Sequence, residues 1–124
     1  HSDLLSVRIH ALTRIWLYHR IDIICLQETH VVYADIAQAK FHLARASEIL
    51  GGCGWDTFWT PASSTRSTGV AILIKHSLVS SGILQVGRPV THDTGRLLTL
   101  PIKWGAHTFT IASIYVPVGS RPEQ

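Results

Sequence analysis

The residues best placed to do chemistry follow a short apolar run near the start of the chain. Residues 21–26 are mainly aliphatic, which is typical of a strand buried on both faces of a covered mixed or parallel sheet. Gln27, Glu28, Thr29 and His30 come next, at the carboxyl end of the strand, where open α/β sheets place ligand-binding groups. A carboxylate there can bind Mg²⁺, which prefers one or two carboxylates, water and phosphate oxygens. Glu28 is therefore a candidate metal ligand, and the alternative is a solvated charge that ends the strand.

Two helices are predicted to position this run. After Ser2 or Asp3, either of which can cap a helix, apolar side chains recur at spacings of three and four as far as His19, which predicts a helix that packs on the sheet. A second helix is predicted from about Tyr33 to Leu50, where a Gly-rich turn ends it. The apolar stripe of the first helix consists of Leu4, Leu5, Ile9, Leu12, Ile15, Trp16 and His19.

The remainder of the chain is predicted to be mainly β structure. The last two expected strands form a hairpin, because only the short connection 104–107 separates them. Helix-strand units followed by antiparallel strands predict an α/β fold with a mixed, mainly antiparallel sheet flanked by helices. A chain of 124 residues is long enough for one domain. The expected strands cover residues 55–60, 69–75, 83–86, 96–103 and 108–116.

The composition limits the class of protein. The formal charge of +3 and a pI near 9.2 are a mild basic bias that suits a polyanionic partner. Cys25 and Cys53 have no C-x-x-C spacing, and the eight histidines have no ligand spacing, so neither a disulfide framework nor a zinc site is indicated. Because the chain contains neither a membrane-spanning apolar run nor a signal peptide, we expect a soluble, intracellular protein that is not secreted and has no membrane partner.

Four short motifs resemble those of the endonuclease/exonuclease/phosphatase superfamily, in the same order. Residues 22–30, with Leu-Gln-Glu-Thr at 26–29, are similar to its D-I-x-x-L-Q-E-T segment, particularly that of the apurinic-endonuclease-like domains of LINE-type retrotransposons. Residues 68–73 are similar to its G-V-A-I-L strand, residues 95–98 to its G-R-x-x strand start, and residues 114–117 to its x-Y-x-P element. The resemblance covers about Asp22 to Pro117.

The resemblance implies roles for individual residues. Glu28 would be a ligand of Mg²⁺ or Mn²⁺, and Tyr115 would lie beside the scissile phosphate, where a phenol can donate a hydrogen bond to a developing oxyanion. The alternative for Tyr115 is a strand-end tyrosine with its ring in the core and its hydroxyl in water. Val118 stands where relatives usually have Asn, which removes a polar group from the site.

Two arginines are candidate phosphate contacts. Arg66 lies in a polar loop, and Arg96 begins the expected strand 96–103. A guanidinium fork matches the oxygens of a phosphate, so either residue could bind a nucleic-acid backbone. The alternative for both is a solvated surface charge.

The resemblance also implies what lies outside the sequence. The family's Asn before the first helix, its Asp-x-Asn pair and its late Ser-Asp-His are not found. We therefore expect residues 1–124 to be a single truncated domain, about half of a four-layer α/β sandwich, from a Mg²⁺-dependent endonuclease that nicks target DNA or hydrolyses another phosphodiester. The fragment alone would be inactive, and its nuclear parent would carry the missing C-terminal half followed by a reverse transcriptase. The alternative is a non-catalytic remnant that serves only as a binding or structural half-domain.

Overall fold

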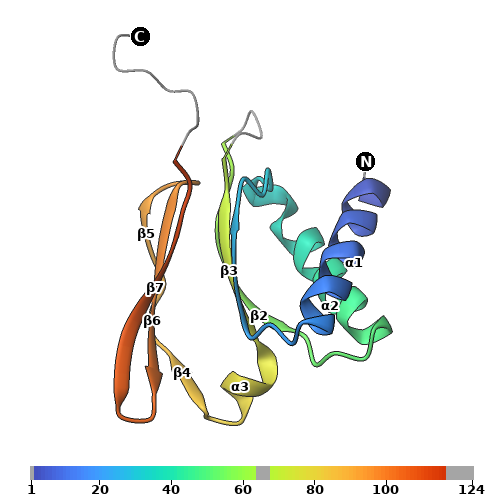
Figure 1. Ribbon diagram of the computed structural model, residues 1–124. Helices are drawn as coiled ribbons and strands as arrows, with labels where there is room; N and C mark the ends of the chain where they lie inside the picture. The colour runs from blue at the N-terminus through green and yellow to red at the C-terminus, as the bar shows by residue number, and fades with distance from the viewer. Residues whose placement is uncertain (1, 64–67, 117–124) are drawn as a thin grey trace, which may run out of the picture.

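The fold has three layers, made of two helices, a first sheet and a second sheet (Figure 1). The structure is a computed structural model and describes residues 2–63 and 68–116. Among the helices of these residues, none has the length and apolar character needed to cross a bilayer. In chain order the elements are α1 (Ser2–Tyr18), β1 (Ile23–Gln27), η1 (Tyr33–Asp35), α2 (Ile36–Ile49), β2 (Trp55–Thr60), β3 (Val70–Lys75), α3 (His76–Ser80), β4 (Leu84–Val86), β5 (Val90–Asp93), β6 (Leu97–Trp104) and β7 (His107–Ile114).

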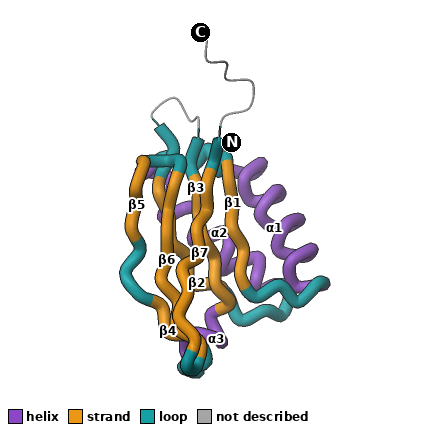
Figure 2. Tube along the Cα trace, turned by 60° about the vertical axis from the view of Figure 1, so that its left-hand side comes forward, coloured by secondary structure: helices purple, strands orange, loops and turns teal. Residues whose placement is uncertain are grey.

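Both sheets are built from antiparallel strand pairs. The first sheet has the order β1-β3-β2, so that β3 is its central strand. In the second sheet β6 is central, with β7 on one side and with β4 and β5 on the other. Within residues 2–63 and 68–116, β1 and β7 each pair with a single strand, so each has an unpaired edge, and these edges lie on the same side of the molecule (Figure 2).

Strand β3 is the centre of the core because both of its faces are buried. Ala71 and Leu73 pack toward the helices, in a cluster that includes Ile9, Trp16 and Leu43. The alternate residues face the second sheet, and a side chain that leaves water here stabilises the fold by about 1.5–3 kcal/mol. This second cluster contains Val70, Ile72, Ile74, Leu84, Leu98, Leu100 and Ile102.

The expected fold class is confirmed, since antiparallel sheets are flanked by helices. The expectation that all strands share one sheet is wrong. A strand that is apolar on both faces needs cover on both, and helices cover only one face of β3, so β4 to β7 form a separate layer on the other. In the described residues, no element covers the outer face of this second sheet, where Ile114 is 53% exposed.

The apolar stripe expected for the first helix is partly wrong. Leu5, Ile9 and Trp16 pack on the core, but Leu4 and Ile15 are exposed. Successive residues of an α-helix are about 100° apart, so residues 4 and 15 point roughly 110° away from the direction of residues 5, 9 and 16. Helix α1 therefore carries two apolar faces, and within the described part of the chain one of them is packed and the other is exposed.

The predicted elements otherwise agree with the structure within a few residues, apart from two that were missed. The hairpin is confirmed, since Trp104 pairs with His107 at the end of the β6–β7 ladder. The missed elements are α3 and β5, which are short. Every residue of β5 is exposed, so it has no apolar alternation, and it becomes a strand only by pairing with β6.

Candidate active site

The four motif segments meet at one end of the two sheets. The backbone N–H of Thr29 donates to the carbonyl of Gly69 at 2.9 Å, and that of His30 donates to the carbonyl of Thr68 at 3.0 Å. The N–H of Gly69 in turn donates to the carbonyl of Gly95 at 2.8 Å, which joins the first sheet to the second. Segments far apart in the sequence are thus held together by their backbones.

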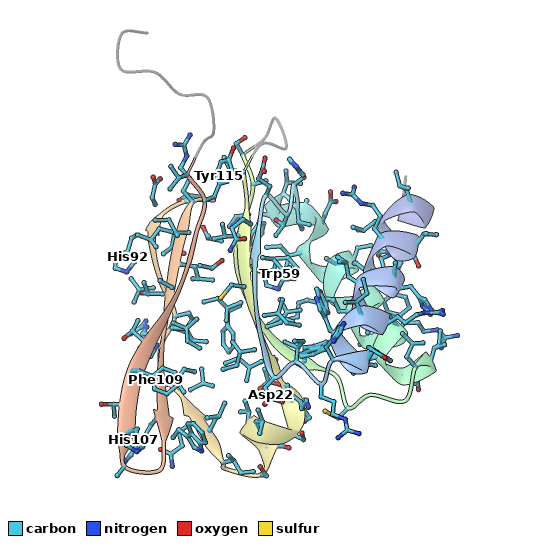
Figure 3. All side chains as sticks on the ribbon, viewed as in Figure 1. Asp22, Trp59, His92, His107, Phe109 and Tyr115 are labelled. Carbon is cyan, nitrogen blue, oxygen red and sulfur yellow. The ribbon has the colours of Figure 1, made fainter. Side chains whose placement is uncertain are left out.

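The second sheet contributes the remaining two motifs at the same end. The N–H of Tyr115 donates to the carbonyl of Arg96 at 2.7 Å, which extends the β6–β7 pairing by one residue on each strand beyond Leu97 and Ile114. Arg96 is consequently the cross-strand neighbour of Tyr115. Figure 3 shows Tyr115 at this end and Asp22 at the other.

Two glycines allow the loops at this end to pack closely. Gly69 and Gly95 have φ of +93° and +78°, a region that favours glycine. A Cβ on Gly95 would lie 2.8 Å from the carbonyl oxygen of Pro61, and one on Gly69 would collide with the hydroxyl of Thr29. The G-V-A-I-L and G-R-x-x motifs therefore begin with glycine because the backbones here leave no room for a side chain.

Backbone strain is concentrated at the same end. Four described residues other than glycine have positive φ, and three of them are Glu28 at +51°, His30 at +57° and Thr68 at +68°. Such conformations are uncommon for these residue types, and they occur often at binding and catalytic sites. The strained turn after β1 sets the direction in which Glu28 leaves the strand.

A serine and a glutamine link the two sheets beside Glu28. The hydroxyl of Ser113, which is fully buried, donates to the carbonyl of Leu26 at 3.1 Å and accepts from Nε2 of Gln27 at 3.3 Å. The sequence analysis did not identify this link. The sequence did contain a signal for it. Residues 109, 111, 113 and 115 alternate onto the inward face of the strand, and Ser113 is the one polar residue among aromatic and aliphatic side chains.

Glu28 is exposed at the mouth of a pocket of about 220 Å³ between the helices and the first sheet. Gln27 and Thr29 share this mouth, and Trp59 lies deeper, between the sheet and the helical layer (Figure 3). Within residues 2–63 and 68–116, no group of three His, Cys, Asp or Glu side chains is placed to hold a metal ion. Among the described residues that line this pocket, Glu28 is the one acidic side chain.

The predicted site residues lie at one end but in different layers. Glu28 faces the helical side of the first sheet, whereas the half-buried ring of Tyr115 packs against the apolar cluster between the sheets. Arg96 is exposed beside Tyr115. Arg66 and Val118 lie outside the described residues.

A second polar cluster, which the sequence analysis missed, lies at the opposite end of the first sheet. Nδ1 of His76 is 2.7 Å from Asp56, and Nζ of Lys75 is 3.0 Å from Asp22. Burial raises the pKa of the neighbouring Cys53 thiol, but hydrogen bonds from Ser77 and the charge of Lys75 outweigh it and lower that pKa below its ordinary value. Burial alone acts on Cys25 in β1 and raises its pKa.

Comparison with known proteins agrees with the motif resemblance. The family model described as endonuclease/exonuclease/phosphatase matches residues 5–117. No curated protein sequence matches the chain. Members of the family are hydrolytic enzymes that generally depend on divalent metal ions. The match spans almost all of the described chain and includes all four motif segments, so this chain belongs to the endonuclease/exonuclease/phosphatase family.

Proposed function

We propose that the chain is part of a metal-dependent phosphodiesterase that nicks DNA, of the kind found in LINE-type retroelements. The observation that supports this most is the convergence of the segments that carry Glu28, Arg96 and Tyr115 at one strained, tightly packed end of the sheets. The mild positive charge of the chain and an exposed arginine at this end favour a polyanionic substrate such as DNA.

Each residue has a distinct role in this proposal. Glu28 would hold Mg²⁺ or Mn²⁺, because it is an exposed carboxylate at a strand end with space for water around it. A bound ion neutralises phosphate charge and makes a bound water more acidic. Tyr115 would donate a hydrogen bond to a phosphate oxygen, and Arg96 would bind the backbone beside it, since their main chains pair directly.

Hydrolysis also needs a general base for the attacking water, which is worth roughly 10²- to 10⁴-fold in rate. We assign that base and the remaining metal ligands to a segment outside residues 1–124. The chain by itself should therefore bind a divalent ion weakly and should not hydrolyse DNA at a detectable rate.

Metal binding is tested by titrating Mn²⁺ into the ¹⁵N-labelled chain. Amide signals of residues 27–30 should broaden first, and Glu28→Gln should abolish that selectivity. Glu48→Gln is the matched control, because Glu48 is an exposed glutamate of α2 whose partner is Arg45. Broadening centred elsewhere, or unchanged in Glu28→Gln, would show that Glu28 is not the metal ligand.

Catalysis is tested by supercoiled-plasmid nicking with Mg²⁺ or Mn²⁺. The unmodified chain should show no nicking above background. Metal-dependent nicking that disappears in Glu28→Ala would mean that residues 1–124 already assemble a complete site. Nicking that survives this change would come from a contaminant.

The substrate is tested by adding a short DNA duplex together with Mg²⁺. We expect the DNA to shift the amide signals of residues 94–96 and 113–116, and we expect inorganic phosphate alone not to shift them. If DNA shifts no signal at this end, the alternative of a non-catalytic half-domain is favoured.

The origin of the chain is tested separately. Genomic sequence that continues into Asp-x-Asn and Ser-Asp-His motifs and then into a reverse transcriptase would identify a LINE-type parent.

A further inference from the structure

Helix α1 has a second apolar face that packs against nothing in the described structure. This outer stripe consists of Leu4, Val7, Ala11, Ile15 and Tyr18, all exposed. The exposed fractions of its large side chains are 61% for Leu4, 65% for Val7, 52% for Ile15 and 81% for Tyr18. Figure 1 shows α1 at the surface of the helical layer. Large exposed side chains gathered on one helix indicate an interaction surface more than isolated ones do.

The spacing of the outer stripe keeps its side chains on one face of the helix. Its members follow one another at intervals of three, four, four and three residues, which is close to an 11-residue apolar repeat (3-4-4) and suits packing against a second helix. At about 100° per residue the stripe covers an arc of roughly 80°, and at 1.5 Å per residue it is roughly 21 Å long. A partner helix of three to four turns would match this length.

Charge on both sides of the outer stripe indicates the chemistry of the partner. Arg8 and Arg14 are exposed and border the stripe on opposite sides, each roughly 20° outside its arc at about 100° per residue. Residues 4–18 contain no Asp or Glu. A shallow hollow on this surface is lined by Val7, His10, Arg14 and Ile15 together with Ser6 and Ala11. The surface is therefore apolar along its centre and basic along both margins.

We propose that the outer stripe of α1 binds an acidic amphipathic helix of another protein. Leucine or isoleucine side chains of the partner would pack on the outer stripe, and its carboxylates would face Arg8 and Arg14. A second copy of α1 suits the surface less, because arginines would face arginines. A membrane surface also suits it less, because a helix that lies in a bilayer interface needs a broader apolar face than this arc.

The probe is a fluorescent synthetic helix of about three heptads, with Leu at a and d and Glu at e and g. Fluorescence anisotropy measures its binding to the whole 124-residue chain, and ¹⁵N spectra should place the shifts on residues 4–18. The double change Val7→Ser with Ile15→Ser should weaken binding at least about tenfold. The control is Phe41→Ser, since Phe41 is 59% exposed on α2 and should leave affinity unchanged.

Charge reversal distinguishes specific charge pairing from nonspecific hydrophobic binding. The double change Arg8→Glu with Arg14→Glu should move the preference from the Glu peptide to the same peptide with Lys at e and g. Both double variants change exposed side chains, and circular dichroism checks that they fold. Equal binding of the two peptides by the unmodified chain would overturn the inference. So would tighter binding to phosphatidylserine vesicles than to the Glu peptide, or a dimer that dissociates in Val7→Ser with Ile15→Ser.

Discussion

Replacing Thr60 by valine should destabilise the protein, whereas the same replacement at Thr57 on the same strand should not. Thr60 ends β2 and is fully buried, and its Oγ1 accepts the backbone N–H of Gly95 at 2.8 Å. This hydrogen bond joins the end of the first sheet to the turn before β6. Valine keeps the shape of threonine but leaves the N–H of Gly95, a buried residue, without an acceptor.

The two substitutions differ in what they do to buried polar groups. An unsatisfied buried donor costs about 1–3 kcal/mol, so Thr60→Val should lower the free energy of unfolding by about 2 kcal/mol. Oγ1 of Thr57 is buried and has no hydrogen-bond partner in the described residues. Its replacement by a methyl group should therefore be neutral or should stabilise the protein by up to about 1 kcal/mol.

Urea unfolding followed by tryptophan fluorescence measures both changes, because Trp55 and Trp59 lie on the same strand. With a slope of about 2 kcal/mol per M, Thr60→Val should lower the midpoint by roughly 1 M. Hydrogen exchange at the Gly95 amide should accelerate in this variant and stay unchanged in Thr57→Val. Equal losses for the two variants, or slow exchange at Gly95 in Thr60→Val, would refute the role of this hydrogen bond.

Two further predictions concern association and thiol reactivity. The uncovered second sheet and the uncharged free edge of β7 should make the chain self-associate; in sedimentation velocity Thr110→Lys should raise the monomer fraction and Ala106→Lys, in the turn, should not. A monodisperse unmodified monomer would contradict this. The lowered pKa of Cys53 and the raised pKa of Cys25 predict that iodoacetamide modifies Cys53 first as pH rises, because the thiolate is the nucleophile. The unmodified chain should therefore react in a fast step at Cys53 and a slow step at Cys25. If Cys53→Ser removed the slow step and kept the fast one, this order would be disproved.

Local sequence determined the elements whose signal lies within a few residues. The aliphatic runs that became β1 and β3 were predicted because buried strands need continuous apolar sequence. The β6–β7 hairpin was predicted because its turn is too short for any other connection. The candidates Glu28 and Tyr115 came from the ends of such strands, together with motifs that resemble a family.

Only the tertiary structure decided how these elements share the apolar surface. The sequence pattern of β6 and β7 does not predict whether these strands extend the first sheet or cover it. An alternating strand can bury its apolar face in either arrangement. The same holds for α1, whose two apolar faces are equivalent in the sequence until one of them packs on Leu73 and its neighbours. The bridge from Ser113 to Leu26 and Gln27 and the bond from Thr60 to Gly95 join distant segments. Such contacts depend on the three-dimensional approach of two sheets, which no local pattern encodes.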